Sequence, residues 1–208
     1  MALSDIYTNL QFFLRWLHVL AGIVWIGHLY FFNLVNVPLQ GALDDASKKL
    51  VNPKLMPRAL WWFRWGAMTT FITGWLLFTL VYMYTPGEGF GPSALFMDEE
   101  GLSSRAIWIL FGMLLGAIMW FNVWFIIWPA QKSMLKGLIP AERLPEVRKR
   151  ALLASRTNTF LSAPLLFAML APQSYGAVST PTLIIVSVIG SLVVLWAIKT
   201  SSKVGTSV

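Results

Sequence analysis

The chain has 208 residues, of which 57% are hydrophobic and only 12% are charged. Soluble domains are usually about one quarter charged, so this composition excludes a disordered chain, a nucleic-acid-binding module and an ordinary soluble enzyme. The sequence has no cysteine, which excludes disulfides, thiolate metal ligands and covalently attached c-type haem within it.

Five apolar segments follow one another along the chain, and each is long enough to cross a bilayer, which takes about 20 helical residues. None alternates like a strand, and each must satisfy its backbone in lipid, so all are predicted to be helices. The predicted helices cover residues 11–34, 61–84, 106–128, 152–171 and 181–198. We therefore expect residues 1–208 to form one all-α integral membrane domain, a bundle of about five transmembrane helices, and we see no internal repeat.

The basic residues occupy alternate connections between these helices. Of the 16 lysines and arginines, all but Arg15 and Arg105 lie around the connections after the first and third helices or in the C-terminal tail. By the positive-inside rule, the N-terminus is outside and the C-terminus is cytoplasmic. The net charge of +7 then belongs to loops that face anionic lipid, and no nucleic-acid partner is needed to explain it.

Two of the connections differ in composition. The outer one, 85–103, is rich in glycine and proline with an acidic end, and is predicted to be an ordered lid or a docking surface. The inner one, 129–151, is predicted to contain a short amphipathic helix. Its expected ion pairs join Glu142 and Glu146 to Arg143 and Arg150.

Ionisable side chains inside predicted spans are the first candidates for function, because they are costly to place in lipid. They are Arg15, His18, His28, Arg64 and Arg156. Snorkelling to headgroups can account for the three arginines, which lie near interfaces. The two histidines are therefore the main candidates to bind a metal.

The spacing of His18 and His28 limits what they can bind together. They are 10 residues apart on one predicted helix, which separates them by about 15 Å along the axis and about 80° around it. They cannot both ligate one iron, so bis-histidine haem within a single copy is excluded. A haem with one histidine and another residue type, a five-coordinate haem, or a ligand from a partner chain remains open.

Simple hydrogen bonding of each histidine to a neighbouring helix is the other interpretation. Asparagines inside the predicted spans are also expected to form interhelical hydrogen bonds. They are Asn33, Asn36, Asn122 and Asn158. Trp25 lies in mid-span and is expected to pack or to line a pocket.

Four sequence blocks resemble one family. They are RWLHVLAGIVWIGH at 15–28, PRALWWFRWGA at 57–67, NVWFIIWPAQK at 122–132 and SRTNTFLSAPLLFAM at 155–169. In order and spacing they resemble the urate oxidase N-terminal family, the PuuD-type membrane urate hydroxylases. The resemblance implies a multi-helix bacterial membrane protein associated with urate oxidation and electron transfer to a cytochrome c. It places these residues on family motif positions: His18, Trp25, His28, Arg64, Trp65, Asn122, Gln131, Arg156 and Asn158.

The chain departs from the family pattern at several polar positions. Thr157 and the pair Pro172-Gln173 stand where the resemblance implies histidines, and Gly66 stands where many members carry an acid. The sequence also contains no Cys-x-x-Cys-His module. These departures leave open whether the chain keeps the scaffold without the urate chemistry.

Three functional hypotheses therefore remain. The first is an accessory or electron-transfer subunit of a redox complex in the bacterial cytoplasmic membrane, with b-type haem on a first-helix histidine. The alternatives are a urate hydroxylase-like oxidoreductase that passes electrons to a cytochrome c, and a purely structural subunit that binds lipid, quinone or pigment. The residues expected to bind a cofactor are His18, His28, Trp25, Arg64, Asn122 and Arg156, and the expected metal ligands are His18 and His28. The expected partners are membrane lipids, other membrane subunits and a cytochrome c.

Overall fold

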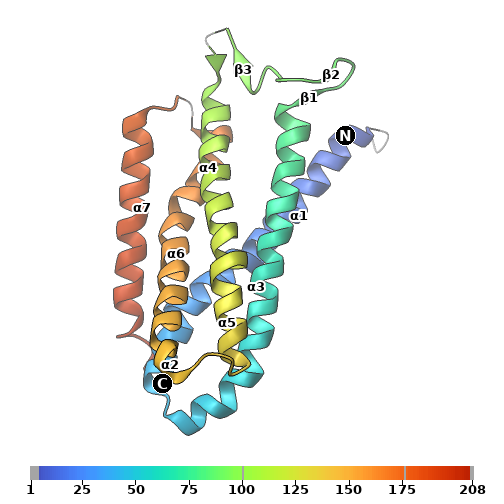
Figure 1. Cartoon of the computed structure of the whole chain (residues 1–208). Coiled ribbons are helices and arrows are strands. Elements are labelled where there is room, and N and C mark those ends of the chain that lie inside the picture. The colour runs from blue at the N-terminus through green and yellow to red at the C-terminus, as the bar shows by residue number, and fades with distance from the viewer. Residues whose placement is uncertain (1–4, 100, 176, 207–208) are drawn as a thin grey trace.

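The computed structural model describes residues 5–99, 101–175 and 177–206, and in this part of the chain five long helical rods run side by side (Figure 1). Two of the rods contain a π-helical turn. The rods are α1 (Ile6–Tyr30), η1 (Phe31–Asn36) and α2 (Val37–Ala42); α3 (Asp45–Tyr82); α4 (Ser104–Phe121), η2 (Asn122–Ile127) and α5 (Trp128–Leu135); α6 (Leu144–Ser174), after the short 3₁₀ turn η3 (Ala141–Arg143); and α7 (Thr180–Ser201).

Each of the five predicted segments lies within or largely overlaps one rod, which confirms the all-α fold. Four rods are long and apolar enough to cross a membrane, and their bounds are Ile6–Ala42, Asp45–Tyr82, Ser104–Leu135 and Thr180–Ser201. The exception is α6, which packs against α4, α7 and η2. A helix shielded by neighbouring helices can carry polar residues that a lipid-facing helix cannot.

The ends of the rods differ from the prediction. The helix α3 begins well before residue 61 and continues through Pro53 and Pro57. The amphipathic helix expected in the inner connection is the start of α6. The ion pairs expected there are wrong, because neither Glu142 nor Glu146 pairs with Arg143 or Arg150 in the part of the chain that the structure describes. These four side chains are exposed, and an ion pair between exposed side chains contributes little stability.

The connection between α3 and α4 forms two small antiparallel hairpins. They consist of β1 (Tyr84–Thr85) with β2 (Gly89–Phe90), and β3 (Met97–Asp98) with β4 (Gly101–Leu102). In Figure 1 these hairpins lie at the same end of the bundle as the N-terminus, whereas α2 and the C-terminus lie at the other end. We call this second end the basic end, because the lysine- and arginine-rich first turns of α3 and α6 lie there.

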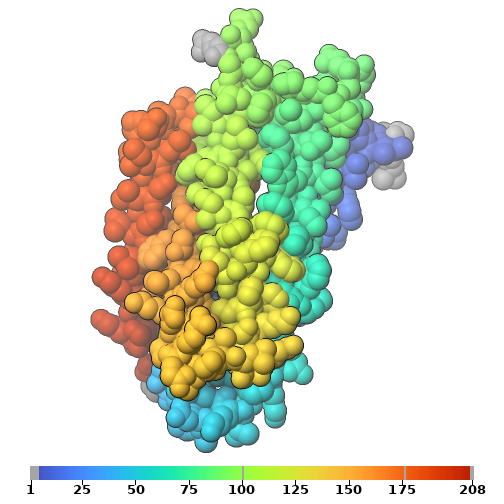
Figure 2. Space-filling view, viewed as in Figure 1, coloured from blue at the N-terminus to red at the C-terminus, as the bar shows by residue number. Residues whose placement is uncertain are grey.

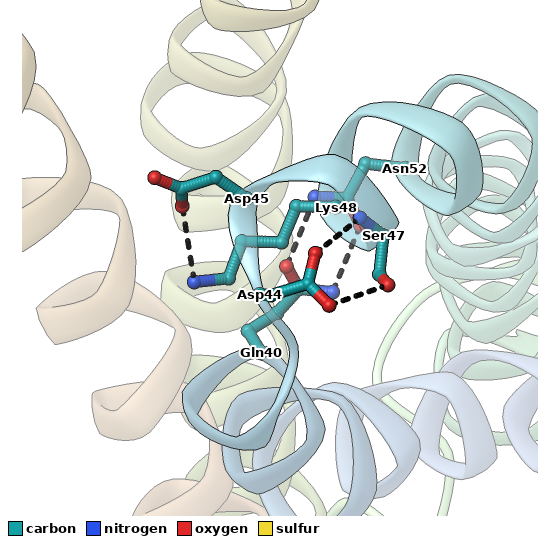
Figure 3. A network of polar contacts seen from close by, with 6 residues as sticks. All are labelled: Gln40, Asp44, Asp45, Ser47, Lys48 and Asn52. Atoms are coloured by element: carbon teal, nitrogen blue, oxygen red, sulfur yellow. Dashed lines mark hydrogen bonds and ion pairs between the residues drawn. The ribbon is translucent and has the colours of Figure 1, made fainter.

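Polar contacts fix the turn between α2 and α3 at the basic end (Figure 3). The Asp44 side chain caps α3 by accepting a hydrogen bond from the Ser47 amide at 2.8 Å. Gln40 and Asn52 form a reciprocal amide pair, with nitrogen-to-oxygen distances of 2.8 and 2.9 Å. These contacts hold α2 against the start of α3.

The two π-helical turns have the same local cause. Pro38 and Pro129 are each the second residue after a π-helix, and each lacks the amide hydrogen of a regular helix. The residue before each proline donates to a carbonyl five residues back, Val37 to Phe32 and Trp128 to Val123. The rods formed by α1 to α2 and by α4 to α5 therefore share a geometry, although we found no repeat in the sequence.

The core lies where α1 crosses α3 and where α4 crosses α6, the two most extensive helix pairs. Trp25, Leu29 and Phe63 are almost completely buried between these pairs. At the first crossing the absence of a side chain on Gly66 lets the backbones approach. A Cβ built there would lie 3.0 Å from the Trp25 amide nitrogen and 3.3 Å from the Ala21 carbonyl oxygen.

Candidate functional site

His18 and His28 lie on the uninterrupted helix α1, as predicted, but they have different surroundings. His18 faces α3, where its Nδ1 lies 3.1 Å from the Thr73 hydroxyl. That hydroxyl donates its hydrogen to the Thr69 carbonyl at 2.6 Å, so it accepts from His18. Gly74 leaves room for the ring, since a Cβ there would be 3.1 Å from His18 Cε1. Neither of the two hollows described below includes His18 in its lining.

His28 is bonded to its own helix and lines an open groove. Its Nδ1 lies 2.8 Å from the Val24 carbonyl oxygen, which can only accept, so Nδ1 carries the hydrogen. Nε2 is then the unprotonated nitrogen of the neutral ring and has a free lone pair. A free Nε2 is what an imidazole needs to ligate a metal.

The groove beside His28 runs between α1 and α3 and has a volume of about 510 Å³. Small residues, Gly27 and Ala59, and aromatic residues, Phe31 and Trp62, line it. Arg58, an exposed cation, also belongs to its lining. The groove therefore combines room for a flat apolar ligand with one imidazole and one positive charge.

The remaining predicted cofactor-binding residues do not gather around this groove. Trp25 is 2% exposed and packs in the core, and its indole nitrogen has no hydrogen-bond partner among the described residues. Arg64 lies over Trp128, with 3.8 Å between Cζ and the ring centroid, and 6.0 Å from the Trp124 ring. This is the geometry of a cation–π contact. The Nε atoms of Arg64 and Arg156 are both buried without a partner in the described chain.

Asn122 and Asn158 bond to each other, as the prediction of interhelical hydrogen bonds requires. Asn122 donates to the Asn158 side-chain oxygen at 2.8 Å, and Asn158 donates to the Met119 carbonyl at 2.9 Å. Asn158 is completely buried. The pair ties η2 to α6 and neither residue lines the groove of His28.

A second hollow lies at the basic end, and the sequence did not predict it. It is a partly enclosed cavity of about 110 Å³ among η1, α3, α5 and α6. Its polar lining residues are Asn36, Gln131, Arg148 and Ser155. The spacing of 148, 151, 152 and 155 along one helix face was the available signal, but the opposing faces are visible only in the fold.

The described residues contain no group of three or more histidine, cysteine, aspartate and glutamate side chains able to hold a metal ion. A metal carried by His28 would therefore need most of its ligands from outside this set, as the iron of a porphyrin does.

The comparisons with known proteins bear on the whole chain. A model of one family, described as urate oxidase N-terminal, matches residues 4–90 and 92–203. No curated protein and no solved structure matches the chain. Because the family match extends over nearly the entire sequence, the chain belongs to the urate oxidase N-terminal family.

Proposed function

We propose that the protein is an electron-transfer or accessory subunit of a bacterial membrane redox complex, and that it holds a b-type haem in the groove of His28. The observation that carries the proposal is the free Nε2 of His28 on a ring that lines a groove of about 510 Å³. All five rods would cross the cytoplasmic membrane, with the basic end inside.

The residues of the groove fit a porphyrin. Gly27 and Ala59 present little side chain, so a flat macrocycle can approach the α1–α3 seam. Phe31 and Trp62 offer aromatic contact, and Arg58 can pair with a propionate. Bound haem supplies reversible one-electron chemistry.

His28 is the lining residue that would ligate the haem iron. Among the groove's described lining residues His28 is the only histidine, and no methionine is present. The fit is therefore to a five-coordinate haem or to a sixth ligand from a partner subunit. His18 takes the structural role, because Thr73 and Gly74 enclose its ring at the helix crossing.

The contacts of the family motif residues support an accessory role over urate turnover. Asn122 and Asn158 direct their amides at each other, and Arg64 is stacked on Trp128. Such groups stabilise the bundle and are not presented to a substrate. Thr157 and Gly66, which stand where the resemblance implies a histidine and an acid, support the same conclusion.

The partner surface of this proposal lies on α7. In Figure 2 this helix forms one long flank of the molecule, and most of its large apolar side chains are exposed. These are Ile184, Ile185, Val188, Ile189, Leu192, Val193 and Trp196. Lipid or another membrane subunit would cover such a face.

An absorption spectrum tests the haem proposal. Protein purified in mild detergent, or titrated with haem, should show a haem Soret band and the reduced bands of a b-type haem. His28→Ala should lose the bands and regain them with added imidazole, whereas the matched variant His18→Ala should keep them. A featureless spectrum of the folded protein after haem titration would overturn the proposal, as would equal loss in both variants.

Urate consumption by membranes that contain only this chain tests the oxidoreductase alternative. We expect none above membranes without the chain. Turnover that depends on Arg64 or Asn158 would replace the accessory role by an enzymatic one.

A further inference from the structure

The cavity at the basic end brings together polar groups from several parts of the fold. The π-helix η1 contributes Asn36, α5 contributes Gln131, and α6 contributes Arg148 and Ser155. Its apolar walls include Phe32 and Leu60. The cavity volume of about 110 Å³ corresponds to roughly four water molecules at their volume in the liquid.

Two of these polar residues have a hydrogen-bond donor with no acceptor among the described residues. Ser155 accepts a hydrogen bond from Asn33 at 2.9 Å, and its own hydroxyl hydrogen finds no acceptor among the described residues. Asn36 is 7% exposed and accepts from Gln40 at 3.3 Å, and its amide nitrogen likewise donates to no described group. Each therefore has a free donor beside the cavity.

The charged side chain that lines the cavity is basic. Arg148 lines the cavity and is also exposed, so it stands at the mouth. No aspartate or glutamate is among the described lining residues. Of the helices at the cavity, α5 adds Lys132 and α6 adds Lys149 and Arg150, and the summed field of these cations favours anions.

The two π-helical turns end at this cavity. Phe32 and Asn36 belong to η1, and Ile127 closes η2. Single π-helical turns occur frequently at functional sites. Here they are the two places where a long rod departs from α-helical geometry, and both adjoin the same polar space.

We propose that this cavity binds a compact anion, of the size of phosphate or a small carboxylate, which enters from the basic end. Arg148 supplies the charge, and Ser155, Asn36 and Gln131 donate hydrogen bonds. A free anion and the phosphate of a lipid headgroup share this chemistry. The proposal is independent of haem, because His28 does not line the cavity.

Thermal unfolding of the purified full chain in an uncharged detergent tests binding. Inorganic phosphate or acetate should raise the unfolding temperature saturably, and chloride at equal ionic strength should not. Arg148→Gln should weaken the apparent affinity by about tenfold or more, because charge-assisted hydrogen bonds are lost. The matched variant Lys149→Gln, an exposed neighbour that does not line the cavity, should bind as before.

A steric variant and a lipid experiment complete the test. Ala151 is 2% exposed and lines the cavity, so Ala151→Leu should fill it and abolish the response while Arg148 remains. Native mass spectrometry of protein from phosphatidylglycerol or phosphatidylcholine nanodiscs identifies the source. One retained phosphatidylglycerol, lost in Arg148→Gln and kept in Lys149→Gln, supports the site with lipid as its occupant.

Two results would overturn the proposal. One is a wild-type protein with neither a saturable anion response nor a retained anionic lipid. The other is equal loss in Arg148→Gln and Lys149→Gln, which would show only a diffuse attraction of anions to the basic end.

Discussion

Replacing Gly66 by alanine adds a Cβ where α1 crosses α3. The variant tests whether the close contact of the two backbones outweighs the higher helix propensity of alanine. The new Cβ would lie 3.0 Å from the Trp25 amide nitrogen, 3.1 Å from Val24 Cγ1 and 3.3 Å from the Ala21 carbonyl oxygen. Two of these are backbone atoms of α1, so they cannot rotate away. The two helices would have to move apart at their closest approach.

The magnitude follows from two opposing effects. Alanine in place of glycine favours a helix by up to about 1 kcal/mol, and overpacking a well-filled contact costs about 1–3 kcal/mol. We expect Gly66→Ala to lower the free energy of unfolding by about 1 kcal/mol. Gly22→Ala should raise it by up to about 1 kcal/mol, because a Cβ at Gly22 meets nothing within 4 Å.

Thermal unfolding in mild detergent, followed by circular dichroism, measures the difference. A gap of about 2 kcal/mol corresponds to about 4–8 °C between the two variants. Gly116→Ala is a second control, because its Cβ would make an ordinary contact at 3.6 Å with Leu165 Cδ1. If Gly66→Ala unfolds at the temperature of Gly22→Ala, the backbone contact does not limit the crossing and our account of Gly66 is wrong.

The structure makes three further predictions. Asn158→Ala should lower the free energy of unfolding by about 2–3 kcal/mol, because its partners stay buried without hydrogen bonds. In the same unfolding assay, replacing the exposed neighbour Thr157 by alanine should change the free energy of unfolding little. Equal losses in the two variants would contradict this prediction. Hydrogen bonds from the following turn hold the pKa of Asp44 below its ordinary value of 3.8, so its cap stabilises α3 above that pH and weakens as the pH falls through the lowered pKa. Hydrogen exchange at the start of α3 should report this loss below about pH 4, and Asp44→Asn should remove its pH dependence. Gln40→Leu should break the amide pair with Asn52 and speed exchange in α2; unchanged exchange would show that packing alone fixes the turn.

The sequence predicted the features that depend on a single helix. Five apolar runs predicted five rods, and the spacing of His18 and His28 excluded shared ligation of one iron. The interhelical role of asparagine was also correct for Asn33 and for the pair of Asn122 and Asn158. These outcomes follow from helical periodicity and from the cost of unpaired polar groups in an apolar setting.

Features that need several helices at once were not predicted. The predicted helix began at residue 61, yet α3 begins at Asp45, and contacts of Met56 and Asn52 with neighbouring elements stabilise its first turns. The groove of His28 and the cavity at the basic end each depend on side chains from different rods. The bond of His28 to Val24, which leaves Nε2 free, likewise depends on a rotamer and is invisible in the sequence.

The π-helices η1 and η2 change which side chains share a face along each rod. A π-helical turn accommodates one additional residue, and one residue advances a helix by about 100°. After Pro38 and Pro129, the side chains therefore point about 100° away from the direction that an uninterrupted α-helix would give them. Deleting one residue from either turn should therefore restore regular winding and leave Gln40 or Gln131 facing its present neighbours, whereas deleting one residue from a regular part of the same rod would rotate them away by about 100°.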